Sequence, residues 1–161
     1  MLRKLIHTTA DPMLTLLRLV LGVVFFAHGA QKVLGWFGGP GYAGTMYHFT
    51  HNMGIPAVFA VLAILAEFLG GIGLILGLLT RIAAFGITVD MLVALFLVHI
   101  HNGFFMNWLG NKPSEGFEFH LLAIAISATV MAHGAGAFSL DHALEGAEHI
   151  HPRPYPVPSG A

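Results

Sequence analysis

The chain has 161 residues, of which 56% are hydrophobic and only 9% are charged. Soluble domains usually carry roughly 25% charged residues, and so few charges cannot keep a water-facing surface hydrated, which excludes an ordinary soluble protein. The net charge of -1 excludes a basic surface for nucleic acid, and the lack of cysteine excludes a disulfide or thiol chemistry within this polypeptide alone.

Four apolar stretches predict membrane-spanning helices, because each has about the 20 residues needed to cross the hydrocarbon core of a bilayer. Backbone groups in lipid must form their hydrogen bonds internally, which favours helices. The predicted spans are residues 13–34, 55–79, 82–101 and 117–137. The first span is longer than the apolar core of a signal peptide, so we expect a membrane helix there instead of a cleaved leader.

Short connections between the spans predict an all-α fold, an integral membrane four-helix bundle of up-down-up-down topology over residues 1–138. A short interfacial helix is expected at residues 48–54, between the first and second spans. Thr80 and Arg81 are expected to form a tight polar turn before the third span. Residues 139–161 are interpreted as a short amphipathic segment followed by a Pro-rich cytoplasmic tail that is extended or disordered.

The placement of lysine and arginine predicts the orientation, since cytoplasmic loops carry an excess of both. One side of the predicted bundle holds Arg3, Lys4, Arg81 and Arg153, and the other holds Lys112 and, at a helix end, Lys32. The first side is expected to face the cytoplasm. Both termini are therefore predicted to be cytoplasmic.

Ionisable side chains inside the spans are the first candidates for function, since a charge there costs about 2.5–3.5 kcal/mol on insertion scales. Arg18, Glu67 and Asp90 lie deepest, and we expect them to form a buried charge cluster. This cluster is either an ion network that holds the bundle together or a proton relay or ligand-pocket floor, and the two roles are compatible. One positive and two negative charges leave a surplus acid, which predicts that Glu67 or Asp90 is protonated.

A second polar group gathers where the ends of the first and third spans meet the starts of the second and fourth. We call it the polar vestibule, and its members are His28, Gln31, Lys32, His99, His101, Asn102, Glu118 and His120. A metal site is one interpretation, but His99 and His101 lie about 200° apart on an ideal helix and match no standard zinc spacing. Lining of a polar pocket, interfacial hydrogen bonding or contact with a quinone is favoured over metal binding.

Short motifs along the chain carry a resemblance to a known family. They are Arg18-Leu19 and His28-Gly29-Ala30-Gln31-Lys32 in the first span, Ala66-Glu67-Phe68-Leu69-Gly70-Gly71 in the second, Thr80-Arg81 and Asp90-Met91 in the third, and Asn102-Gly103-Phe104-Phe105 and Gly116-Phe117-Glu118 before and at the start of the fourth. Over residues 13–145 the chain resembles the DoxX family. The resemblance implies a bacterial inner-membrane protein of four helices that is linked to redox work.

One branch of that family resembles a subunit of a thiosulfate:quinone oxidoreductase, and another is associated with complexes that resist oxidative stress alongside superoxide dismutase and a sulfurtransferase. The resemblance therefore implies the membrane subunit of a redox complex, with the bilayer and a redox protein as partners and a quinone as the candidate cofactor. No catalytic residue or cofactor-binding motif is identified, and the oligomeric state is left open. The alternatives are a small-solute or proton transporter and a purely structural or assembly protein.

Overall fold

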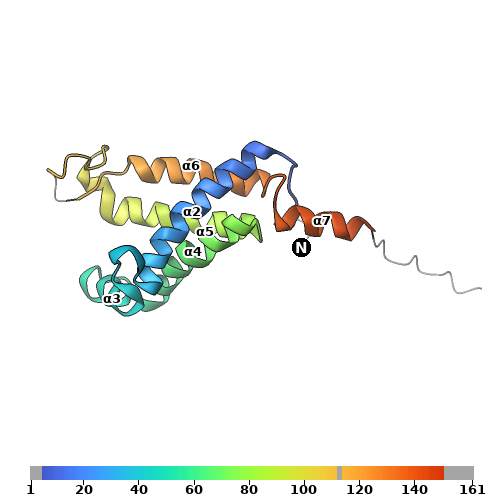
Figure 1. Ribbon diagram of the computed structural model, residues 1–161. Helices are drawn as coiled ribbons and strands as arrows, with labels where there is room; N and C mark the ends of the chain where they lie inside the picture. Colours follow the sequence, from blue (N-terminus) through green and yellow to red (C-terminus); the bar gives the residue numbers. More distant parts are fainter. Residues whose placement is uncertain (1–4, 112–113, 151–161) are drawn as a thin grey trace, which may run out of the picture.

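The computed structural model describes residues 5–111 and 114–150, and side chains only as far as residue 146. The described residues form helices and no strand, which confirms the predicted all-α class. Its α-helices are α2 (Pro12–Leu34), α3 (Gly41–Tyr47), α4 (Ala57–Leu76), α5 (Thr80–Ala94), α6 (Glu118–His133) and α7 (Leu140–Ile150), as Figure 1 shows. Two π-helical turns, η2 (His48–Asn52) and η3 (Leu95–His99), and two 3₁₀ turns, η1 (Trp36–Gly38) and η4 (Ile100–Asn102), complete the described helices.

Three helical stretches are long and apolar enough to cross a membrane: Pro12–Leu34, Ala57–Leu76 and Thr80–Asn102. The fourth predicted span is a shorter apolar helix, α6, of 16 residues. Helix α2 packs against α4 and α6, and α5 packs against the same two helices. The up-down-up-down order of the four helices across the membrane stays a prediction.

The ends of the helices differ from the predicted spans at glycines with a left-handed backbone. Helix α4 stops at Leu76, three residues early, because Gly77 has a φ of 67° and caps the helix. The polar turn expected at Thr80 and Arg81 lies earlier, at residues 77–79, and Thr80 already begins α5. The predicted interfacial helix at residues 48–54 is the end of a longer helical stretch that begins with α3 and closes with η2.

Helices α2 and α4 pack with their backbones unusually close, because glycines line the interface. A Cβ on Gly29 would lie 2.4 Å from the Cα of Phe68, and a Cβ on Gly71 would lie 2.4 Å from the backbone nitrogen of Phe26. In lipid such close approach is a main source of helix association, since no hydrophobic force acts between helices there. These contacts set the depth of each α2 side chain against α4.

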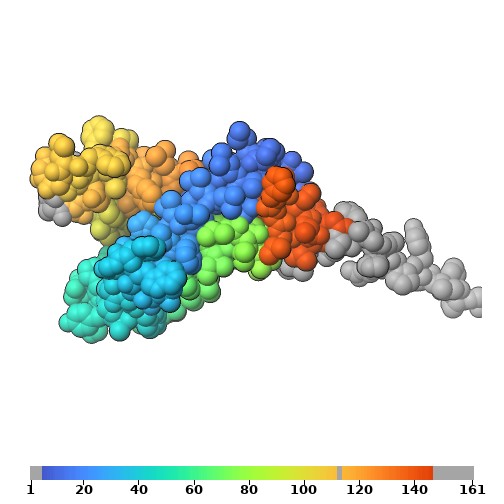
Figure 2. Space-filling view, in the orientation of Figure 1, coloured from blue at the N-terminus to red at the C-terminus, as the bar shows by residue number. Residues whose placement is uncertain are grey.

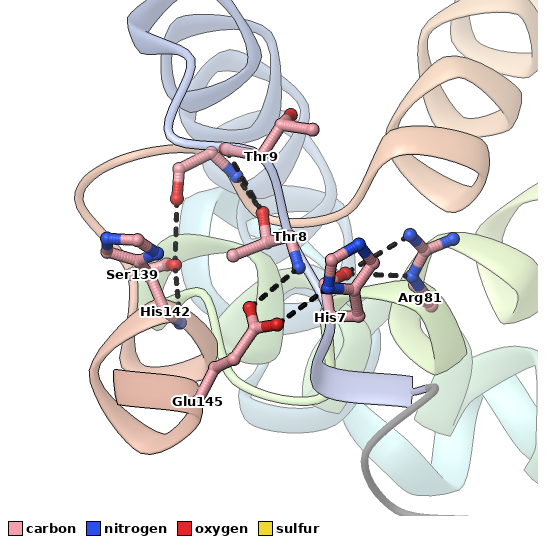
Figure 3. Close-up of polar contacts among 8 residues, drawn as sticks. His7, Thr8, Thr9, Arg81, Ser139, His142 and Glu145 are labelled. Atoms are coloured by element: carbon pink, nitrogen blue, oxygen red, sulfur yellow. Dashed lines mark hydrogen bonds and ion pairs between the residues drawn. The ribbon is translucent and has the colours of Figure 1, made fainter. Parts of the chain in front are cut away.

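The end of the bundle that holds α7 is closed by contacts with the N-terminal segment (Figure 3). Glu145 of α7 accepts hydrogen bonds from the His7 ring at 2.6 Å and from the Thr8 backbone N–H at 3.2 Å. The Asp141 carboxylate accepts hydrogen bonds from the backbone N–H groups of Leu79 and Thr80 at 2.8 and 2.9 Å, at the start of α5. The short amphipathic segment predicted after residue 139 is thus a docked helix, and the Pro-rich tail from residue 151 lies outside the described residues.

Candidate functional site

A cavity of about 400 Å³ lies in the half of the bundle opposite α7. It is bordered by α2, α4, α5, α6, both π-helical turns and the loop before α6. Most of its lining is apolar, and its ionisable lining residues are His28, Lys32, Glu67, Asp90, His99, Glu115 and His120. Small-molecule sites in proteins usually occupy about 300–1,000 Å³ and combine apolar walls with a few polar groups. This central cavity has both properties.

The deepest polar group in the central cavity consists of Lys32, Glu67 and Asp90, which we call the acid–lysine cluster. Lys32 Nζ lies 2.5 Å from Glu67 Oε2, and the Glu67 side chain is buried. The Asp90 side chain lies in contact with that of Glu67. Helices α2, α4 and α5 each contribute one member, so the cluster depends on the packing of all three.

Arg18 does not join Glu67 and Asp90, although the sequence analysis grouped the three. Its guanidinium is buried among backbone carbonyls, where it donates hydrogen bonds to Leu74, Ile75, Ala135 and Phe138. Leu74 and Ile75 belong to the last turn of α4, where the Leu74 carbonyl also accepts the backbone N–H of the capping Gly77 at 3.3 Å. The cation beside Glu67 is Lys32, because the Gly29 contact with α4 brings the last turn of α2 to the level of Glu67.

Two imidazoles stand together in another part of the cavity wall. The rings of His99 and His120 lie 4.1 Å apart between centroids. His99 Nδ1 lies 2.9 Å from the carbonyl oxygen of Glu115, and since a carbonyl only accepts, this nitrogen carries the proton. His120 is 5% exposed, and its Nδ1 has no hydrogen-bond partner among the described residues. A neutral His99 therefore keeps Nε2 as an acceptor, and His120 keeps a ring nitrogen for a ligand.

Both π-helical turns border the cavity, where η2 contributes Phe49 and η3 contributes Leu97, Val98 and His99. Such turns add one residue to a helical turn and are frequent at functional sites. The added residue rotates the chain, so that His99 lines the cavity while His101 is exposed. His99 and His101 therefore lie in different surroundings, one in the cavity wall and one at the surface, as their angular separation on a helix suggested.

The structure divides the polar vestibule into two halves. His28, Lys32, His99 and His120 line the cavity, while Gln31, His101, Asn102 and Glu118 do not. Glu118 instead accepts hydrogen bonds from the Met106 backbone N–H at 2.8 Å and the Trp108 indole at 3.3 Å. Asn102 donates to the carbonyl of Val98 at 3.0 Å. These residues shape the loops beside the cavity.

Glu115 is a cavity residue that sequence reasoning missed. It lies in the loop before α6, where no helical periodicity predicts the direction of a side chain. Its carboxylate accepts a hydrogen bond from the Asn107 backbone N–H at 2.5 Å. A glutamate five residues before the first histidine of the fourth span was the available signal, but it did not indicate contact with His99. Within residues 5–111 and 114–150, no group of three or more metal-ligating side chains is arranged to hold a metal.

Comparison with known proteins now identifies the family. A sequence model of the DoxX family matches residues 13–100. The chain belongs to the DoxX family. It is 31% identical over 127 residues to the "Inner membrane protein YqjF" of Escherichia coli, which covers 79% of this chain and 88% of that protein. This membership and the three membrane-length helices make the chain a membrane protein of a family with inner-membrane members.

Other relatives of this DoxX-family chain carry less specific or different names. It is 29% identical over 126 residues to the "Putative oxidoreductase CatD" of Bacillus subtilis, over 78% of this chain and 82% of that protein. It is 33% identical over 132 residues to an uncharacterized protein of Haemophilus influenzae, over 80% of this chain and 88% of that one. No solved structure matches the chain.

Proposed function

We propose that this protein is the membrane subunit of a redox complex and that its central cavity binds the headgroup of a quinone. The observation that supports this most directly is the acid–lysine cluster in a cavity whose lining is mostly apolar. A quinone ring is apolar on its faces and has carbonyl oxygens that need hydrogen-bond donors. The ammonium of Lys32 and the histidine rings of the same cavity supply such donors.

The cluster also suits the proton chemistry of a quinone. Reduction to hydroquinone takes two electrons and two protons, one proton for each carbonyl oxygen. Lys32 balances one of the two carboxylates, so the acid–lysine cluster as a whole is electrically neutral when Glu67 and Asp90 hold one proton between them. That proton lies inside the cavity, and we propose that it is donated to one oxygen of the bound ring while the second proton enters by way of the histidine pair.

The electrons in this proposal come from a redox partner protein. The sequence carries no cofactor-binding motif, and its chain has no cysteine for thiol chemistry. The name of one relative, "Putative oxidoreductase CatD", also supports the redox assignment. The protein therefore acts as the quinone-binding subunit, and the partner supplies the electron carrier.

Binding of a short-chain benzoquinone to the purified protein in lipid nanodiscs tests the proposal. Isothermal titration should show saturable binding, and Lys32→Met and Asp90→Asn should each weaken it about 10- to 100-fold. Hydrogen bonds to charged groups contribute about 1.5–3 kcal/mol, which corresponds to that range. His101→Gln is the matched control, since His101 lies outside the cavity, and its affinity should equal that of the wild type.

Three results would contradict the proposal in distinguishable ways. A transporter would be favoured if the wild type binds no quinone but carries a proton flux in liposomes that Asp90→Asn abolishes. Variants that lose folded protein and binding together, at every position tested, would favour a structural role. Equal binding by the wild type and Lys32→Met would show that the ligand does not reach the acid–lysine cluster.

A further inference from the structure

Helices α4 and α5 pack closely from their middle toward the α7 end of the bundle. A Cβ on Gly86 of α5 would lie 3.4 Å from the Cβ of Ala66, and a Cβ on Gly70 of α4 would lie 3.6 Å from the carbonyl oxygen of Ala83. Toward the other end both helices border the central cavity, through Ala63 on α4 and Leu97 on η3. Figure 2 shows a hollow at the end of the molecule opposite α7, between the arm that carries α3 and η2 and the arm that carries the loop before α6.

The residues that face each other across this hollow are apolar and reach the outside of the molecule. On one side Ile55 and Ala63 line the cavity and are half-buried. On the other side Val93 and Leu97 line the same cavity, yet they are 46% and 62% exposed. A cavity residue that is also exposed, as Val93 and Leu97 are, marks a place where the cavity meets its surroundings. We call these four residues the lateral opening.

Lipid is expected around the lateral opening. Both helices that border the lateral opening belong to stretches long and apolar enough to cross a membrane. None of the four side chains can form a hydrogen bond, so the opening offers nothing to a hydrated ligand. The polar groups of the cavity lie inside, at the acid–lysine cluster and the histidine pair. A molecule that fits this distribution has a polar head and an apolar tail.

We infer that the ligand enters the cavity from the bilayer through the lateral opening, and that its tail stays between α4 and α5 while its head lies at the acid–lysine cluster. This inference rests on the proposed function for the nature of the head. It adds that the physiological ligand is a lipid-dissolved quinone with a long apolar tail. Water-soluble quinones bind the same head site without using the opening.

The test compares two ligands with one headgroup, 2,3-dimethoxy-5-methylbenzoquinone and the same ring with a decyl tail. Ala63→Trp places a large ring in the lateral opening, whereas Leu65→Trp places it on the neighbouring surface of α4, where Leu65 is 42% exposed and lines no part of the cavity. In nanodiscs, Ala63→Trp should weaken binding of the tailed quinone at least tenfold and change binding of the tailless one less than twofold. Leu65→Trp should change neither.

A second measurement covers the case in which Ala63→Trp does not fold. The chain has no cysteine, so Leu97→Cys and Val89→Cys each give one labelling site for a bimane fluorophore. Both side chains are exposed on the same helical stretch, but Val89 lies outside the cavity lining. A quinone with a spin-labelled tail should quench the label at residue 97, and excess unlabelled decyl quinone should reverse that quenching. Any quenching of the label at residue 89 should not be reversed by the decyl quinone.

The outcomes separate this inference from the proposed function. If the tailless quinone does not bind the wild type, the proposed function fails. If it binds but Ala63→Trp weakens both quinones equally or neither, the head site stands and the lateral opening is refuted. Reversible quenching that is equal at residues 97 and 89 would likewise refute the lateral opening.

Discussion

Two cations of helix α2, Arg18 and Lys32, do different work although both lie in the same span. Lys32 faces a carboxylate inside a cavity, and its ammonium has donors to spare for a ligand. Arg18 uses the fixed fork of its guanidinium to join the end of α4 to the segment between α6 and α7. Arginine suits that position because it presents five donors in one plane, whereas lysine presents three at one point.

Arg18→Lys should therefore destabilise the protein without weakening ligand binding. Leaving the carbonyl of Ile75, Ala135 or Phe138 without a partner should cost about 1–3 kcal/mol for each buried group. Thermal unfolding in detergent, followed by size-exclusion chromatography, should show a lower midpoint than for the wild type. Lys32→Met should weaken quinone binding and also lower the midpoint, because it leaves the buried Glu67 carboxylate without its cation. Loss of quinone binding by fully stable Arg18→Lys would contradict this division.

At the scale of elements, the acidic side chains of α7 hold together the start of α5 and the segment before α2. Asp141 holds the first turn of α5, and Glu145 holds the N-terminal segment before α2 (Figure 3). Arg81 of α5 adds hydrogen bonds to the carbonyl of His7 at 3.1 and 3.2 Å. Three segments that are far apart in the chain are thus joined by a few polar contacts at one end of the bundle.

The contact of Glu145 with His7 and Thr8 should weaken in acid. The hydrogen bond from the His7 ring holds the pKa of Glu145 below its usual value, and the Thr8 N–H acts in the same direction, as do the charges of His7 and His142. A carboxyl whose pKa is lower in the folded state stabilises the fold above its unfolded pKa, and that stabilisation is lost as the pH falls through the folded pKa. The Thr8 amide should therefore lose protection from hydrogen exchange below the ordinary carboxylate range.

Glu145→Gln is the matched variant for that measurement. Its Thr8 amide should exchange faster at neutral pH, and its protection should no longer depend on the titration of residue 145. The Phe117 amide, which donates to the backbone carbonyl of Gly103 at 3.2 Å, serves as the internal control because no titratable side chain accepts its hydrogen bond. Equal acid sensitivity of Thr8 in the wild type and in Glu145→Gln would refute the role of the carboxylate.

The whole molecule has two unlike ends. One carries α7 and the N-terminal segment, and the other carries aromatic loops in which Trp36, Phe37, Phe105 and Trp108 are each more than half exposed. Aromatic side chains are enriched at membrane interfaces, where an apolar ring meets polar headgroups. Arg81 lies at the α7 end, while Arg3, Lys4, Lys112 and Arg153 lie outside the described residues. The cytoplasmic placement of both termini remains a prediction from the arginine and lysine pattern.

Single cysteines test that orientation without background labelling, because the chain has none of its own. His142→Cys lies on α7, and Asn111→Cys lies in the loop before α6, and both positions are exposed. In intact bacterial spheroplasts, a membrane-impermeant maleimide should label residue 111 at once and residue 142 only after lysis. The opposite order would place the termini and α7 outside the cytoplasm.

The sequence by itself determined that this is a helical membrane protein, and it singled out the ionisable residues of its spans. Hydropathy and segment length suffice for the first because lipid leaves the backbone no alternative to internal hydrogen bonds. The DoxX motifs likewise predicted the family that comparison then showed. The ionisable residues that the sequence identified include Glu67, Asp90 and Lys32, because a charged residue in an apolar span can be recognised without knowing the direction of its side chain.

Only the tertiary structure decided which of those residues meet. Lys32 instead of Arg18 lies beside Glu67, because the close approach at Gly29 sets the relative depth of α2 and α4. The π-helical turn η3 directs His99 into the cavity, and the fold of a loop brings Glu115 to the same wall. These outcomes depend on contacts between segments that are distant in the chain, and a one-dimensional pattern of hydropathy carries no information about such contacts.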